Sequence, residues 1–201
     1  MPAVLVPLVL LAASPGVEFS LLGGWGASDY SIGSLCPQEV DFGRTAWAGQ
    51  LEVRTEYLPE GHLGVGLTFG THLEPYRWRA ESDSISRGEE VREGYIALSA
   101  SWRPVEGPVR PYARGAFGLH FGSLQHSCSH GDYTVSDGDG VATAVGMTLG
   151  GGTMLHLAGP AWLLAELGYT IVPRDSFQGW QVAWASSMNS WRFLLGAGMS
   201  L

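Results

Sequence analysis

Residues 47–57 read Trp-Ala-Gly-Gln-Leu-Glu-Val-Arg-Thr-Glu-Tyr, and this stretch decides the fold class. Mostly apolar or small residues alternate with mostly polar or charged ones, and successive side chains of an extended strand point to opposite faces. A helix would instead bring Glu52 and Glu56 side by side and scatter the apolar residues around its axis. The alternation therefore predicts a β-strand with one apolar and one polar face.

Seven other stretches repeat this period of two. None of them carries a charged residue on its apolar face. Together with the first stretch they predict an all-β chain of eight strands. The expected strands are 17–26, 47–57, 62–73, 95–103, 109–121, 143–157, 161–172 and 190–201.

The connections between these strands alternate in length. Three are short turns rich in Gly and Pro, which favour tight turns. The other four are long and polar, and short turns at one end with long loops at the other are typical of outer-membrane barrels. An even strand count also places the two termini of the barrel, the start of its first strand and the end of its last, on the short-turn side. The short turns are 58–61, 104–108 and 158–160, and the long connections are 27–46, 74–94, 122–142 and 173–189.

The composition of the two faces indicates which one meets lipid. Charged residues make up only 15% of the chain, against roughly 25% in soluble domains. The polar face is rich in Gly, Ser and Ala, which suits an eight-stranded interior just wide enough for side chains. Ten residues at about 3.3 Å each, tilted by roughly 40°, rise about 25 Å, the height of a membrane barrel's apolar band. We therefore expect an eight-stranded antiparallel up-and-down transmembrane β-barrel.

Aromatic residues gather near the ends of the expected strands, as they do at the two membrane interfaces. We expect this girdle to contain Trp25, Trp47, Tyr57, Trp102, Phe121, Trp162 and Trp191.

The first sixteen residues are interpreted as a secretory signal peptide. Residues 1–13 are apolar and uncharged, and Ser14, Pro15 and Gly16 form a small-residue cleavage region. The signal is atypical because no Lys or Arg precedes the apolar run; the alternative is a buried N-terminal strand. The barrel is then expected to span residues 17–201.

Charge and cysteine content exclude other classes. The formal net charge of −8 argues against nucleic acid, since binding phosphates requires clustered Lys and Arg. Two cysteines are too few for a disulfide scaffold.

Two further motifs resemble a known family. Residues 110–118, Arg-Pro-Tyr-Ala-Arg-Gly-Ala-Phe-Gly, and residues 162–169, Trp-Leu-Leu-Ala-Glu-Leu-Gly-Tyr, are similar to strands of small outer-membrane barrels of the OmpA, OmpX and OmpW type. The resemblance covers the mature chain and implies integral outer-membrane location and passage through the barrel-assembly machinery. One departure is Leu201 at the end, where the family usually has Phe.

Charged residues on the inward face form the first candidate site. We expect the glutamates to meet the arginines across the lumen, because buried charges are tolerated only when paired. Two interpretations stay open, a polar plug and a gate or proton-narrow pore; the plug is favoured because so narrow a barrel normally has no continuous channel. The residues are Glu52, Arg54, Glu56, Arg114, Glu166 and Arg192.

Two loop features form weaker candidates. Cys36 and Cys128 fall in different long connections on the oxidising side, so a disulfide between them is our hypothesis. Residues 125–132, with His126, Cys128, Ser129 and His130, have spacing that suits zinc or a Ser–His hydrolase. No second motif supports either chemistry, so we expect no metal, no cofactor and no catalytic residue.

The expected function follows from the architecture. We expect a monomeric structural or surface-interaction protein whose long loops face outward, with outer-membrane lipid and lipopolysaccharide as partners. Residues 74–94 mix Arg77, Arg79, Arg87 and Arg92 with acidic residues; we expect a solvated loop there, with contact to phosphorylated lipid sugars or divalent cations as the alternative. The other function classes are a narrow pore for small or apolar solutes and a lipid-modifying enzyme.

Overall fold

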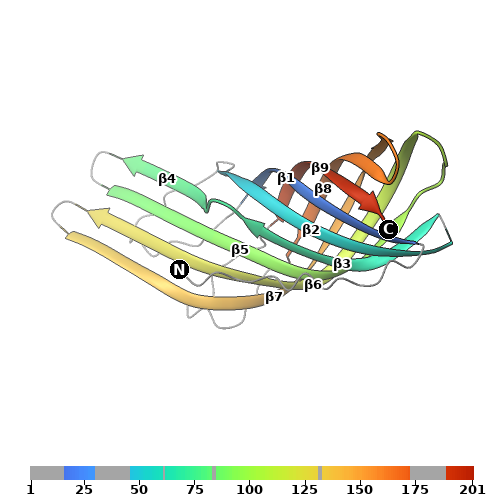
Figure 1. Cartoon of the computed structure of the whole chain (residues 1–201). Helices are drawn as coiled ribbons and strands as arrows, with labels where there is room; N and C mark the ends of the chain where they lie inside the picture. Colours follow the sequence, from blue (N-terminus) through green and yellow to red (C-terminus); the bar gives the residue numbers. More distant parts are fainter. Residues whose placement is uncertain (1–15, 30–45, 61, 83–84, 131–132, 173–188) are drawn as a thin grey trace.

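The computed structural model describes residues 16–29, 46–60, 62–82, 85–130, 133–172 and 189–201 as an antiparallel β-structure (Figure 1). The described part of the chain contains no helix of the length and hydropathy needed to cross a bilayer. The strands are β1 (Val17–Asp29), β2 (Ala46–Glu60), β3 (Leu63–His72), β4 (Tyr76–Ser82), β5 (Ile85–Trp102), β6 (Val109–His130), β7 (Tyr133–His156), β8 (Ala161–Ile171) and β9 (Asn189–Ser200).

The sheet closes on itself into an eight-stranded barrel. The hydrogen-bonded order is β3-β2-β1-β9-β8-β7-β6-β5-β4, and β3 also pairs with β5. β3 and β4 both pair with β5 and together form one barrel strand, interrupted at residues 73–75. Pro75 lies in the interruption, where a residue without an N–H donor is tolerated. The eight-stranded antiparallel fold is therefore confirmed.

The first and last strands of the barrel lie side by side. β1 pairs with β9 from Glu18 opposite Ser200 to Asp29 opposite Asn189. The short connections at residues 104–108 and 157–160 lie at the same end of the barrel as Glu18 and Ser200, since β6 and β8 begin there.

The two faces of the barrel are inverted relative to a soluble protein. Large apolar side chains on every barrel strand face outward and are exposed, with Leu98 at 69%. Charged side chains of the alternate positions are buried inside, with Glu166 at 1% and Arg192 at 2%. Soluble proteins almost never bury such groups while exposing a continuous apolar surface, whereas lipid requires this arrangement. The sequence-based assignment of the faces is confirmed.

Most of the expected aromatic girdle lies on the outer surface, but Trp162 does not. Trp25, Trp47 and Trp191 are exposed near the long-connection end, and Trp102 near the short-turn end. Assigning Trp162 to this girdle was wrong: it is 6% exposed because it shares the inward positions of β8 with Glu166. Inside, its indole Nε1 donates to Ser200 Oγ at 3.0 Å, and the Arg110 guanidinium lies 4.5 Å from its ring centroid.

Two of the expected long loops are strands. The ladder between β5 and β6 runs without interruption from Trp102 opposite Ala113 to Ile85 opposite His130. β4 covers residues 76–82, and β6 and β7 pair as far as His130 opposite Tyr133. Residues 74–94 and 122–142 were expected to be loops because their polar residues break the apolar alternation, yet main-chain hydrogen bonds continue a ladder without it. Figure 1 shows β4–β7 projecting beyond the other strands.

The remaining expected connections fall mainly at residues 30–45 and 173–188, outside the described residues, as does most of the expected signal peptide, residues 1–15.

The outward apolar face gives a prediction at Leu98, near the middle of the lipid-facing row of β5. Leu98→Arg should lower the free energy of unfolding in lipid vesicles by about 2–4 kcal/mol, because an arginine near the bilayer midplane is poorly solvated. Equilibrium denaturant titration followed by tryptophan fluorescence measures this. Leu98→Ala is the control for lost side-chain volume. A change within about 0.5 kcal/mol, as at a water-exposed site, would mean that this face does not meet hydrocarbon.

Candidate functional site

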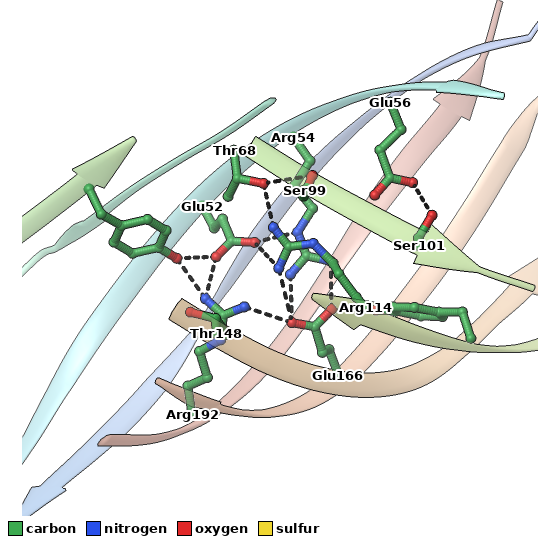
Figure 2. Close-up of polar contacts among 12 residues, drawn as sticks. Glu52, Arg54, Glu56, Thr68, Ser99, Ser101, Arg114, Thr148, Glu166 and Arg192 are labelled. Carbon is green, nitrogen blue, oxygen red and sulfur yellow. Dashed lines mark hydrogen bonds and ion pairs between the residues drawn. The ribbon is translucent and has the colours of Figure 1, made fainter. Parts of the chain in front are cut away.

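Six side chains from five strands form a central network across the barrel lumen, and Figure 2 labels its arginines and glutamates. The outward apolar positions force the alternate residues of the same strands inward, so residues far apart in the sequence meet at one level. The members of the central network are Glu52 and Arg54 on β2, Tyr95 on β5, Arg114 on β6, Glu166 on β8 and Arg192 on β9.

Glu166 is the acceptor shared by most members of this network. Arg54 donates to both of its carboxylate oxygens, from Nη1 to Oε2 at 2.7 Å and from Nη2 to Oε1 at 2.8 Å. Arg192 Nη2 donates to Oε1 at 2.9 Å, and the Tyr112 hydroxyl donates to Oε2 at 2.9 Å. Such bidentate, charge-assisted contacts satisfy a carboxylate that is shielded from water.

Glu52 links the same arginines to Tyr95. Arg192 Nη1 donates to Glu52 Oε2 at 2.6 Å and to the Tyr95 hydroxyl at 2.6 Å. Tyr95 in turn donates to Glu52 Oε2, and Arg54 Nε donates to Glu52 Oε1. Each of the two carboxylates therefore contacts more than one arginine, and removing one carboxylate affects several cations at once.

Arg114 is held more loosely than the other two arginines. Its Nη1 lies 3.5 Å from Glu52 Oε1 and 3.6 Å from Glu166 Oε1, while its Nη2 donates to Thr68 Oγ1. Thr68 continues the contact to Ser99 Oγ at 3.3 Å. With three arginines facing two glutamates, the central network carries a formal excess of one positive charge.

Glu56 does not join the central network, although the sequence-based prediction grouped it there. It lies nearer the short-turn end, where Arg103 Nη2 is 2.7 Å from Glu56 Oε2 and 2.7 Å from Glu18 Oε2. Ser101 Oγ donates to Glu56 at 2.9 Å, and Figure 2 shows this pair to one side of the central network. Glu56 lies four positions beyond Glu52 along β2, so it is at a different level. This short-turn cluster has one formal excess negative charge.

A third polar group lies at the long-connection side of the central network. Glu93 is paired with His120 Nδ1, and the His120 ring stacks on Tyr95 with centroids 5.2 Å apart. His72 Nε2 lies 2.9 Å from Gln50 Nε2. Tyr95 therefore belongs to both groups and connects this group to Glu52. Glu93, Tyr95 and Arg103 were not predicted as site residues, although each lies at an inward position of the period-two pattern.

A cluster of mostly apolar buried side chains lies inside the barrel beside these polar groups. Its members lie on β1, β6, β7, β8 and β9 toward the short-turn end, and all are at most 7% exposed. The lumen therefore contains packed side chains at successive levels. The cluster consists of Leu22, Tyr112, Met154, Trp162, Leu164 and Leu194.

Inward glycines leave the space that the large polar side chains occupy. A Cβ atom at Gly70 would lie 2.2 Å from Cζ of Tyr95, and one at Gly168 would lie 2.8 Å from Nε of Arg192. The high glycine content of the polar face thus follows from packing in a narrow lumen.

The network predicts a large cost for neutralising its central acceptor. Glu166→Gln should reduce the free energy of unfolding in lipid vesicles by roughly 3–5 kcal/mol, because it leaves three buried arginines with Glu52 as their one remaining carboxylate in the central network. Denaturant titration measures the change. Glu106→Gln is the matched control, since the Glu106 side chain is 73% exposed and should contribute less than about 1 kcal/mol. Equal stability of the two variants would show that the central network does not support the barrel.

The other candidate residues lie partly outside the described structure. Cys36 and the side chain of Cys128 are not described, so the disulfide stays a prediction. Residues 125–130 belong to β6, so placing this His-, Cys- and Ser-containing motif in a loop was wrong. Ser127 Oγ donates to the Gly88 carbonyl at 3.4 Å. Within the described residues, no group of three or more His, Cys, Asp or Glu is placed to hold a metal ion.

Comparison with known proteins identifies the fold. No protein-family model matches the sequence, and no curated protein matches it. Solved structures do match. Neisserial surface protein A has a TM-score of 0.60 and 13% identity, over 92% of this chain and 97% of that chain. A major outer membrane protein from Thermus thermophilus has a TM-score of 0.50 and 17% identity, over 91% of this chain and 98% of that chain.

At these identities the likeness concerns the fold, and for the fold the resemblance to small outer-membrane barrels is confirmed. Location rests in addition on the surface of this chain, which exposes a closed band of apolar side chains and buries its charges. The chain is an integral β-barrel of a bacterial outer membrane.

Proposed function

We propose that this protein is a non-conducting barrel that anchors an outward-facing β-sheet, with a structural or surface-interaction role and no catalytic activity. The observation that carries the proposal is the filled lumen. Charged side chains from β2, β6, β8 and β9 and the Tyr95 hydroxyl of β5 meet across it, and an apolar cluster packs beside them. The barrel then serves as a stable support and not as a channel.

The barrel supports a second structure at its long-connection end, which we call the outer sheet. It consists of residues 76–82, 85–92, 123–130 and 133–141. These parts of β4–β7 continue beyond the lipid-facing rows as a paired sheet. The β5–β6 ladder runs without interruption from the barrel into the outer sheet, and the β6–β7 ladder continues there after a register shift between Ser123 and Gln125, so the outer sheet is an extension of the barrel wall. A rigid sheet loses less conformational entropy on contact than a flexible loop of the same length, which favours an interaction role.

A filled lumen predicts that the purified, folded protein conducts no ions. In planar lipid bilayers the wild-type protein should give no discrete current steps above bare lipid, because an eight-stranded barrel leaves no water-filled path once its interior is packed. A porin of larger strand number, incorporated in the same lipid, is the positive control. Reproducible steps that disappear in Glu52→Gln would instead support the narrow pore with the central network as its gate.

The orientation of the outer sheet gives a separate prediction on whole cells. An epitope inserted after His130, at the end of β6, should bind antibody on intact cells, because the long-connection end of such barrels faces outward. The same epitope inserted after Gly159, in the short turn before β8, should bind only after the cells are permeabilised. Labelling of both positions only after permeabilisation would contradict a surface role.

A further inference from the structure

Two histidines and one glutamate lie inside the barrel at its long-connection end, where the lumen meets the outer sheet. His120 and Glu93 are paired and almost fully buried, at 2% and 7% exposure. His72 lies within electrostatic reach of both. We call these three residues the mouth group. Histidine is the side chain that ordinarily changes its charge between about pH 5 and pH 8, so the charge of the mouth group depends on pH in that range.

The charged groups on the inner side of the mouth group disfavour a second positive charge there. Arg192 of β9 acts electrostatically on Glu93. Tyr95 of β5 stacks on the His120 ring, with centroids 5.2 Å apart, and donates to Glu52 of the central network. Because the central network has a formal excess of one positive charge, it repels a further cation at the mouth group.

On β2, β7 and β8 the histidines contact uncharged residues. A Cβ atom at Gly146 of β7 would lie 2.6 Å from Nε2 of His120 and 3.0 Å from Cγ2 of Val172, so this side is closely packed. Gln50 Nε2 of β2 donates to His72 Nε2 at 2.9 Å. This bond requires the neutral imidazole, because a protonated histidine carries N–H donors on both ring nitrogens.

The mouth group lies at the level where the main-chain connection between the barrel and the outer sheet is interrupted in two places. The barrel strand formed by β3 and β4 is interrupted at residues 73–75, directly after His72. The β6–β7 ladder shifts register between Ser123 and Gln125, just beyond His120. Such a shift leaves a residue unpaired and disrupts the ladder locally. Side-chain contacts at this level therefore contribute more to the position of the outer sheet than they would beside unbroken ladders.

We propose that the mouth group is a pH-sensitive lock, which holds the outer sheet in position at neutral pH and releases it on acidification. At neutral pH, Glu93 pairs with one histidine and His72 accepts a hydrogen bond from Gln50. When the pH falls below about 6.5, where a solvated imidazole becomes charged, the second histidine takes up a proton and turns outward into water. The outer sheet then loosens at the two interruptions, while the continuous β5–β6 ladder keeps it attached. The inference rests on the proposed anchoring of the outer sheet by the barrel.

The test measures amide hydrogen exchange of the whole protein in phosphatidylcholine vesicles. Protection factors, corrected for the intrinsic exchange rate, are compared at two values on either side of the ordinary histidine range, about pH 7.5 and about pH 5.5. In the wild type, protection of the outer sheet should fall about tenfold at the lower pH, because opening is then coupled to the uptake of one proton by an imidazole. Protection of residues 95–102 and 112–119 in the barrel should not change.

Three variants assign the response to the mouth group. His72→Gln should keep the outer sheet protected in acid, because position 72 then takes up no proton. Gln50→Glu should also keep it protected, because the new carboxylate pairs with the charged His72. His62→Gln is the matched control: His62 lies at the short-turn end with its side chain 53% exposed, so the acid response should remain.

Equal protection of the outer sheet at both pH values would overturn the lock, and so would an acid response that persists in His72→Gln. An equal loss of protection in the barrel residues would show general loosening by acid and would also contradict it. Weak protection of the outer sheet already at neutral pH would contradict the proposed anchoring itself, and the lock with it. Circular dichroism checks that His72→Gln and Gln50→Glu are folded. Because these variants change different strands, either one is sufficient for the test.

Discussion

The rest of the structure depends on the requirement that main-chain N–H and C=O groups in hydrocarbon are paired within the chain. The pairing of β1 with β9 meets it, since it joins the first and last strands and leaves the barrel without an open edge. Closure of eight strands then fixes the lumen width, and that width is just enough for side chains to fill. The outward apolar rows, the inward polar rows and the inward glycines are consequences of this closure.

Charged groups in so narrow a space must satisfy one another, and the network shows how this is done. Glu52 and Glu166 each contact arginines from more than one strand, so the ion pairs join strands that the hydrogen-bonded ladders do not directly connect. The positive excess of this group and the negative excess around Arg103 offset each other along the barrel axis. Buried ion pairs add little net stability over apolar packing, but they make the arrangement sensitive to the loss of any one partner.

Period two in the sequence was sufficient to predict the barrel strands and to divide the side chains of each strand into two sets. The composition of the two sets then indicated which one enters the lumen, and five members of the central network belong to that set. Neither feature could predict the level at which each inward residue lies, so Glu56 was grouped with the wrong partners and Arg103 was missed. Trp162 was predicted to lie in the outer aromatic girdle because it is a tryptophan near a strand end. Its place in the alternation of β8 indicates an inward side chain instead. The residues of the outer sheet were predicted to be loops because they lack apolar alternation. Outside the membrane neither face of a strand needs to be apolar, so this alternation disappears while the main-chain hydrogen bonds of the ladder continue.

The arrangement of both faces makes sense only if the exposed apolar side chains meet lipid in a closed barrel. The most direct test compares heated and unheated samples of the detergent-extracted membrane fraction on a denaturing gel. A closed membrane barrel predicts that the protein is in the outer-membrane fraction and that its unheated band migrates differently, because the ladders resist detergent until heated. A soluble protein with identical migration in both samples would contradict the account and would require the apolar face to lie inside.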